Sequence, residues 1–290
     1  MPPPDSHPVR FYAISQDELQ PLEIPGGATD VHELFDGLPL GIYEGLRSFE
    51  GTRLLRLEQH LDRADRSLQL AGIGRRVDRS TMRIALARAL ELWPLPEARI
   101  RFDELSAPAR ALGTESATLL ALSSLPELPA TAREEGLVLG LASNLHRDRP
   151  LIKEARWVVR RRHADHRSEH VYERVLLDEE GRILEGTSSN LFLVKDGVIF
   201  TAGAGVLEGV TRGIALEVAA QAGVPVRPEA LAVDDVARCQ EAFLTSASRG
   251  LLPVRSIGGR LVGAGRPGPI WRSLHELYLT LVQREARPPA

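Results

Sequence analysis

Hydrophobic residues recur at two different spacings along this 290-residue chain, and each spacing predicts a different kind of element. After Glu58 they recur every three or four residues, as at Leu61 and Leu68. This spacing places them on one face of a helix, which Gly72 can end. Further helices are predicted within residues 78–93, 157–168, 211–222 and 270–282.

Short apolar runs bounded by turn residues predict strands. These runs cover residues 9–15, 53–57, 98–102, 117–122, 137–142, 174–178, 182–184, 191–194, 198–200 and 242–246. Two pairs of runs are separated by hairpin turns, at residues 179–181 and 195–197. Because helices and strands are intermixed without a steady alternation, the pattern favours an α+β fold over a doubly wound sheet.

Prolines mark the best candidate for a linker. Pro126 and Pro129 lie within the run 125–130, where two prolines in four residues disfavour both helix and central strand. We therefore expect a small N-terminal domain over residues 1–125, a linker over 126–135 and a larger C-terminal domain over 136–290.

Composition and charge narrow the classes of partner and compartment. A net charge of −3 and a pI near 6.3 give no basic field for nucleic acid. No run approaches the roughly 18 apolar residues that a membrane span needs. The single cysteine, Cys239, fits a reducing compartment, and no histidine pair has clear metal-ligand spacing. We expect a cytoplasmic protein with no nucleic-acid partner, no membrane partner and no metal site.

Lysine is rare in this chain, because nearly all basic residues are arginine. Lys153 and Lys195 are the only lysines. Lys195 belongs to a hairpin turn signal and is expected to face solvent. Lys153 follows the apolar residues Leu151 and Ile152. It is either a reactive amine or a surface lysine at a strand edge, and the local sequence leaves both readings open.

A carboxylate and a helix start suggest a partner for that amine. Glu185 enters a hydroxyl-rich turn, and a buried glutamate needs a cationic or hydrogen-bonding partner, such as a protonated pyridine nitrogen. Gly209 and Thr211 precede a helix whose free amides suit a phosphate. Two alternatives stay open: Glu185 caps its own turn, and Thr211 is an ordinary N-cap.

Two further segments suit the same anion. Arg63 lies near the start of an amphipathic helix and can reach a phosphate, or it is a surface arginine paired with Asp62 or Glu58. Hydroxyl side chains end the strand at residues 242–246, where a plain turn is the alternative. A lysine, a carboxylate and an anion-binding helix start are together what a protein needs to hold pyridoxal 5'-phosphate.

These segments resemble the fold-type IV pyridoxal-phosphate family over residues 35–283. The family contains branched-chain aminotransferases, D-amino-acid aminotransferases and 4-amino-4-deoxychorismate lyases. The matching segments, in order, are residues 41–47, 58–63, 152–153, 185–192 and 207–212. The resemblance implies two domains: a small N-terminal α/β domain and a larger C-terminal domain with a mixed, barrel-like sheet and helices. It also implies a homodimer with the active site near the interface.

The resemblance assigns roles residue by residue. Lys153 would form the Schiff base and transfer the proton during catalysis, and Glu185 would pair with the ring nitrogen. The expected cofactor-binding residues are Arg63, Lys153, Glu185, Ser188, Ser189, Asn190, Leu207, Gly209, Val210, Thr211, Ser246, Ala247 and Ser248. The candidates for substrate binding, chosen by charge and position, are Tyr43, Arg47, Arg101, Trp157 and Arg249.

The chain departs from the family at several positions. Ala247 stands where the family often has threonine, so that Ser246 or Ser248 would have to compensate. Residues 160–167 are highly charged, and no arginine–histidine carboxylate trap is in register. The expected function is transamination between an amino acid or amine and a 2-oxo acid. The alternatives are an aminodeoxychorismate lyase with the same cofactor and a binding protein that has lost catalysis; the donor and its stereochemistry stay open.

Overall fold

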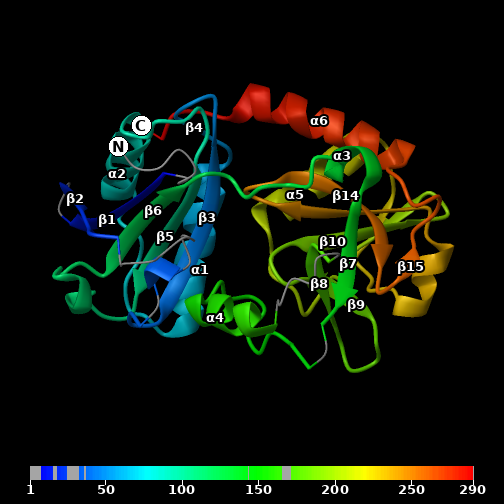
Figure 1. Cartoon of the computed structure of the whole chain (residues 1–290), viewed down its shortest axis with the longest axis horizontal. Helices are drawn as coiled ribbons and strands as arrows, with labels where there is room; N and C mark the ends of the chain where they lie inside the picture. The colour runs from blue at the N-terminus through cyan, green and yellow to red at the C-terminus, as the bar shows by residue number, and fades with distance from the viewer. Residues whose placement is uncertain are drawn as a thin grey trace. The chain divides into compact units, whose positions relative to one another are not determined.

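The structure, a computed structural model, describes residues 8–15, 18–24, 33–35, 37–142, 144–164 and 171–289. The chain divides into two compact units (Figure 1). The first comprises Met1–Pro126, Ile152–Val159 and Glu285–Ala290, and the second comprises Glu127–Leu151 and Arg160–Arg284. Each unit combines helices with a sheet, which confirms the expected α+β class. The domain boundaries at residues 125 and 136 stay a prediction.

The first unit contains an antiparallel sheet of six strands in the order β2-β1-β6-β5-β3-β4. The strands are β1 (Val9–Ser15), β2 (Glu18–Pro21), β3 (Gly41–Phe49), β4 (Arg53–Leu54), β5 (Arg99–Leu105) and β6 (Thr118–Ser123). Short 3-10 helices lie at Glu33–Phe35 and Arg110–Leu112. Both faces of the sheet are covered, because alternate residues of β1 and β6 belong to two different hydrophobic clusters.

Two helices supply the main core of the first unit. Helix α1 (Leu57–Ala71) ends at Gly72, which takes the left-handed conformation with φ 75°. Helix α2 (Arg79–Glu91) is capped by Asp78, whose side chain accepts a hydrogen bond from the Thr81 amide. Their apolar faces pack with residues of β3, β5 and β6 in one cluster of buried side chains. The spacing of hydrophobic residues predicted both helices.

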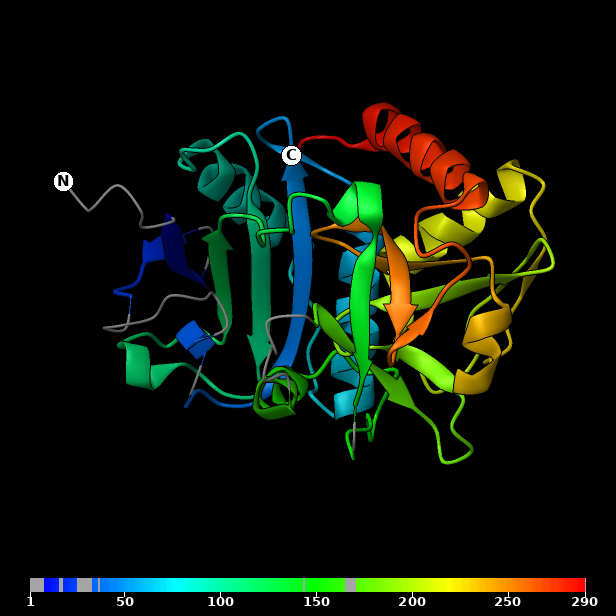
Figure 2. The same ribbon diagram turned by 45° about the vertical axis from the view of Figure 1, so that its right-hand side comes forward.

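The second unit is built on a nine-stranded mixed sheet, shown from another side in Figure 2. Its strands are β7 (Leu137–Leu141), β8 (Glu173–Leu177), β9 (Ile183–Gly186), β10 (Asn190–Lys195), β11 (Val198–Phe200), β12 (Val226–Arg227), β13 (Glu241–Ser246), β14 (Gly250–Ile257) and β15 (Arg260–Leu261). The order is β12-β11-β10-β13-β14-β7-β8-β9, and β9 also pairs with β10. That pairing closes six strands into a ring, which confirms the expected barrel-like sheet.

Helices accompany this sheet. They are α3 (Ala132–Glu135), α5 (Val210–Gln221), the 3-10 helix Val233–Arg238 and α6 (Pro269–Glu285). Helix α5 contacts β13, and its N-terminus is the helix start that the sequence predicted. Helix α4 (Ala155–Ala164) contains residues of both units. No helix within the described residues is long and apolar enough to cross a bilayer.

Some elements differ from the expectation. The strand expected over 53–57 is only Arg53–Leu54, because Arg56 takes a left-handed conformation and α1 begins at Leu57. Strand β14 was not predicted, since Pro253 argues against a central strand. The parallel pairing of β14 with β7 begins only at Val254, after the proline. Residues 165–168 of the helix expected over 157–168 lie outside the described residues.

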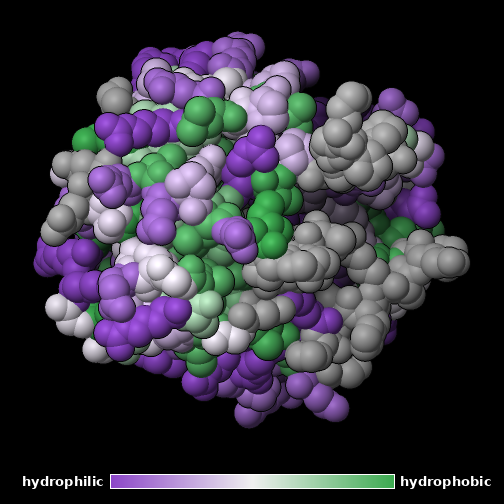
Figure 3. All heavy atoms as spheres, turned by 60° about the vertical axis from the view of Figure 1, so that its left-hand side comes forward, coloured by the Kyte–Doolittle hydropathy of each residue, from purple (hydrophilic) through white to green (hydrophobic). Residues whose placement is uncertain are grey.

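Large hydrophobic side chains that are exposed are distributed over many elements. They are Ile24, Leu40, Leu70, Leu92, Leu95, Leu151, Val159, Leu261 and Leu279. Figure 3 shows one face, on which hydrophobic residues are interspersed with hydrophilic ones. Single exposed hydrophobic residues of this kind are ordinary for a folded protein.

Candidate functional site

Lys153 lies in the first unit, where its backbone is fixed on both sides. Its carbonyl oxygen accepts a hydrogen bond of 2.9 Å from the Tyr43 amide, and its own amide donates to Ser67 Oγ at 3.3 Å. A bridge between Ile42 and Glu154 holds the segment beside β3. The half-buried side chain places Nζ 4.6 Å from the centre of the Tyr43 ring. The lysine is therefore held by its backbone, while its amine lies over an aromatic face.

A buried ion pair joins β3 to α1. Glu44, which is 0% exposed, accepts hydrogen bonds from Arg63 Nε at 2.8 Å and Arg63 Nη2 at 2.6 Å. His60 Nδ1 lies 3.0 Å from the same carboxylate. Burial alone would raise the pKa of Glu44, but the Arg63 guanidinium outweighs it and lowers that pKa to about 2. Burial lowers the pKa of His60, so that Arg63 is the cation of this group.

The alternative reading of Arg63 as a surface arginine is wrong. Its side chain is buried against Glu44, whereas Asp62 and Glu58 both pair with Arg79. Glu44 was missed because the sequence analysis selected only its neighbour Tyr43. The signal was present, since alternate residues of a strand face opposite sides and Glu44 therefore faces α1.

The opposite face of β3 and β5 carries a second buried arginine. Arg101 makes two hydrogen bonds of 2.7 Å to the carboxylate of Asp103. Its guanidinium lies 3.9 Å from the centre of the Phe35 ring and 4.9 Å from that of Tyr43. Burial raises the pKa of Asp103 although Arg101 opposes it. The structure thus brings together Tyr43 and Arg101, two of the substrate-binding candidates.

The remaining candidates in the first unit lie elsewhere. Arg47 donates to both carboxylate oxygens of Glu97, at 2.8 and 2.7 Å, and its guanidinium lies 5.0 Å from the centre of the Phe49 ring. Trp157 is buried in α4. These contacts give Arg47 a structural partner but do not test a role in substrate binding.

Glu185 is buried in the second unit and held at both oxygens. Its Oε2 accepts hydrogen bonds from Asn190 Nδ2 at 3.1 Å and from the Leu207 amide at 3.2 Å. Its Oε1 lies 2.9 Å from Arg147 Nε, and the two side chains are 2% and 6% exposed. The alternative in which Glu185 caps its own turn is wrong, because the Ser188 amide donates to Glu173 instead. Arg147 was missed, since nothing in residues 146–149 distinguishes it from its neighbour Arg149.

Glu173 and Arg249 organise the hydroxyl groups of the second unit. Glu173 accepts from Ser189 Oγ at 3.0 Å and from Arg249 Nη1 at 3.1 Å. Arg249 also donates to Ser246 Oγ at 2.8 Å and to Ser188 Oγ at 2.9 Å. Burial alone would lower the pKa of Arg249, but its neighbours, Glu173 among them, raise it. The structure therefore brings four predicted residues together around Glu173, a residue that the sequence analysis missed.

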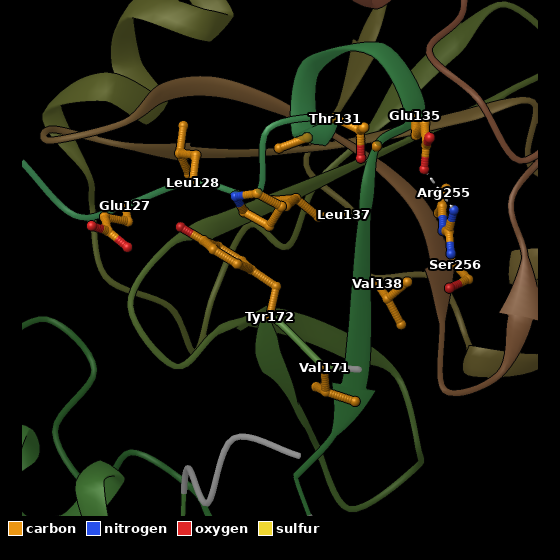
Figure 4. A pocket seen from close by; sticks show the side chains of 13 residues that line it. Glu127, Leu128, Thr131, Glu135, Leu137, Val138, Val171, Tyr172, Arg255 and Ser256 are labelled. Atoms are coloured by element: carbon orange, nitrogen blue, oxygen red, sulfur yellow. Dashed lines mark hydrogen bonds and ion pairs between the residues drawn. The ribbon is translucent and has the colours of Figure 1, made fainter. Parts of the chain in front are cut away.

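A hollow of about 840 Å³ adjoins this cluster in the second unit. Figure 4 shows Tyr172 on its wall, together with side chains of α3 and β7. The Tyr172 hydroxyl accepts a hydrogen bond of 3.1 Å from Arg249 Nη1. Tyr172 is thus shared between the hollow and the cluster, and no local pattern around it indicated either contact.

The start of α5 forms a close-fitting cradle. Gly209 is its N-cap, so the alternative in which Thr211 is the N-cap is wrong. No side chain caps the first turn, whose amides are left for another partner. A Cβ at Gly209 would lie 2.2 Å from Asn190 Oδ1, which only glycine avoids. Val210 and Leu207 are both buried beside it.

An unsatisfied hydroxyl lies close to this cradle. Thr245 is the register partner of Asn190 across β13 and β10, so the two side chains share one face of the sheet. Thr245 Oγ1 is buried and has no hydrogen-bond partner within the described part of the chain. Ala247 and Ser248 follow in the turn before β14. A buried orphan of this kind needs an explanation such as a bound group.

The comparisons with known proteins agree on one family. The model of the class IV amino-transferase family matches residues 41–257. The branched-chain-amino-acid aminotransferase of Pseudomonas aeruginosa is 30% identical over 269 residues, which cover 87% of this chain and 86% of that protein. A putative branched-chain-amino-acid aminotransferase of Methanocaldococcus jannaschii is 27% identical over 253 residues, or 82% of this chain and 85% of that protein.

A solved structure shows the same fold. It is a branched-chain amino acid aminotransferase from T.th. with pyridoxamine 5'-phosphate, and it has a TM-score of 0.79 and 23% identity, over 97% of this chain and 98% of that chain. The family recognised from the sequence is thereby confirmed, and with it the expected transferase chemistry and cofactor. The chain belongs to the class IV aminotransferase family.

Proposed function

We propose that this protein is a transaminase in which Lys153 is the reactive amine and pyridoxal 5'-phosphate is the cofactor. The observation that carries the proposal is Glu185, a buried carboxylate held by Asn190 and Leu207 in the way that a partner of a protonated ring nitrogen would be held. Branched-chain amino acids are the first donors to test, since the relatives bear that name. The second substrate is a 2-oxo acid.

The residues of the second unit fit the cofactor. The uncapped first turn of α5 offers the amides of Val210 and Thr211 to a phosphate. The buried hydroxyl of Thr245, which has no partner within the described residues, offers one more donor. Ser246 already accepts from Arg249 but keeps its own hydroxyl hydrogen. Thr245 is thus an additional candidate that compensates for Ala247.

Each residue of the chain has a defined task in this proposal. Pyridoxal phosphate, when bound, supplies an electron sink for the carbon that loses its proton. Lys153 Nζ moves that proton, and a positioned base of this kind contributes roughly 10²–10⁴-fold. Glu185 holds the ring nitrogen, and Arg63, oriented by Glu44, adds a fixed positive charge for the phosphate. Arg249, Arg101 and Arg47 remain candidates for the substrate carboxylate.

We also propose a cytoplasmic homodimer. The reducing compartment is supported by Cys239, whose thiol is buried and has its pKa raised to about 11 by that burial. Light scattering on the purified protein should give twice the mass of 31.8 kDa. A mass that stays at one chain over a wide concentration range would contradict the dimer.

The direct test is a panel of amino donors, in both enantiomers, with pyruvate and 2-oxoglutarate as acceptors. The wild type should form the new amino acid from at least one pair, and Lys153→Ala should lose that activity by at least about 10²-fold. Lys195→Ala is the matched control, because Lys195 is the other lysine and pairs with Asp235. It should keep wild-type rates.

The other outcomes are informative. Pyruvate release from aminodeoxychorismate without any acceptor would identify the lyase instead. A protein that binds no cofactor would be the binding protein that has lost catalysis. Wild-type turnover by Lys153→Ala would refute the assignment of the amine.

A further inference from the structure

Arg147 makes an ion pair with the residue that the proposed function assigns to the cofactor ring. Its Nε lies 2.9 Å from Glu185 Oε1, and both side chains are almost fully buried within the second unit. Taking two charges out of water is costly, so a buried pair is retained only where its geometry or its task compensates. The proposed transamination assigns no task to Arg147.

The surroundings of Glu185 show what Arg147 adds. Asn190 and the Leu207 amide are neutral donors and both serve Oε2. Arg212 is another nearby cation: it donates to the Ala202 carbonyl oxygen at 3.0 Å and is influenced by the charges of Glu208 and Glu185. Burial lowers the pKa of Arg212 although these acids oppose it. Arg147, by contrast, is in direct ion-pair contact with Oε1.

We propose that Arg147 is a positioning residue that shares Glu185 with the ring nitrogen of pyridoxal phosphate and thereby makes that nitrogen harder to protonate. The inference rests on the proposed function. A carboxylate stabilises a nearby cation through its charge, and an arginine at the same carboxylate has already neutralised much of that charge. Two cations on one buried carboxylate also repel each other. Arg147 therefore limits how strongly the cofactor can draw electrons.

The arginine has a second consequence in the protein without cofactor. It keeps Glu185 ionised in a buried place where a lone carboxylate would take up a proton. Without Arg147 the pKa of Glu185 would rise above its unfolded value. An acid whose pKa is raised on folding stabilises the protein at low pH and loses that contribution as pH rises. The loss of Arg147 should therefore destabilise the cofactor-free protein more at pH 8 than at pH 5.

The experiment follows the ring nitrogen itself. Pyridoxal phosphate labelled with ¹⁵N in the ring is bound to each protein, and the ¹⁵N chemical shift is followed against pH. In Arg147→Met the nitrogen should stay protonated to a pH about one to three units higher than in the wild type. Arg147→Lys keeps the charge and should titrate like the wild type. Arg149→Met, two residues away on the exposed side of the segment, is the matched control and should also match the wild type.

The outcomes separate the inference from the proposed function. If the wild type binds no pyridoxal phosphate, the proposed function fails and the inference fails with it. If the wild type binds it and Arg147→Met titrates at the same pH, only the inference is refuted. If Arg147→Met does not fold, Arg147→Gln, which keeps a donor for Oε1 without the charge, decides by the same titration. Melting temperatures of the cofactor-free proteins at pH 5 and pH 8 give the second readout, in which an equal loss at both pH values contradicts the role of charge.

Discussion

At the scale of single residues, burial separates the arginines that sequence patterns could not. Arg63 was predicted from its place on an amphipathic helix, but its partner Glu44 lies 19 positions earlier and is revealed only by the packing of α1 on β3. Arg249 and Glu173 are 76 positions apart. Such pairs depend on the tertiary fold, whereas Glu185 and Asn190, five positions apart, could be found from one turn.

Glu44 should make the stability of the protein depend on acid. Its pKa of about 2 in the folded state lies below the unfolded value, so it stabilises the protein above the unfolded pKa and loses this contribution as pH falls toward 2. The contribution is roughly 3 kcal/mol at neutral pH. Glu44→Gln should lower the melting temperature at pH 7 and flatten its decline between pH 5 and pH 3.

Thermal melts at several pH values check this prediction. Glu50→Gln is the control, because Glu50 is an exposed partner of Arg53 and should change little. An acid decline in Glu44→Gln as steep as that of the wild type would mean that other carboxylates cause it.

Thr245 should show opposite effects with and without cofactor. Thr245→Val removes a buried hydroxyl that has no partner within the described residues, which should stabilise the cofactor-free protein by about 1 kcal/mol. The same change should weaken binding of pyridoxal phosphate while leaving binding of pyridoxal, which lacks the phosphate, unchanged. Thr245→Ser keeps the hydroxyl and should retain affinity. Equal affinities in Thr245→Val and wild type would exclude Thr245 as a phosphate contact.

At the scale of elements, local signals predicted more than long-range ones. The hydrophobic spacing, Asp78 and Gly72 predicted α1 and α2 because caps and faces are local properties. Strand β14 could not be predicted, since its place between β13 and β7 depends on residues far along the chain and on pairing that begins after Pro253. The ring of strands likewise depends on a single long-range closure, β9 on β10.

The start of α5 offers a test of this scale. Gly209→Ala should displace Asn190, because the added Cβ would lie 2.2 Å from its Oδ1, and Asn190 in turn holds Glu185. We expect a loss of about 1–3 kcal/mol in stability and a weaker affinity for pyridoxal phosphate. Gly213→Ala, in the same helix with open space around it, should instead stabilise by about 1 kcal/mol. Calorimetry and cofactor titration measure both, and two variants that behave alike would contradict the cradle at Gly209.

At the scale of the whole molecule, the family and the fold agree while the assignment of roles remains to be tested. Lys153 belongs to the first compact unit, and Glu185, α5 and the turn after β13 belong to the second. The family match spans residues 41–257 and therefore includes all of these segments. The sequence could predict this membership because the matching segments occur in order. It could not predict the donor, since the arginines near the site are distinguished only by their partners.

The amine at position 153 is the central claim, and the chain allows it to be tested without ambiguity, because Lys153 and Lys195 are its only lysines. The protein is incubated with pyridoxal phosphate, reduced with borohydride, digested and analysed by mass spectrometry. The account predicts one phosphopyridoxyl group per chain, on the peptide that contains Lys153. A label on Lys195 or on the terminal amine, with Lys153 unmodified, would contradict it.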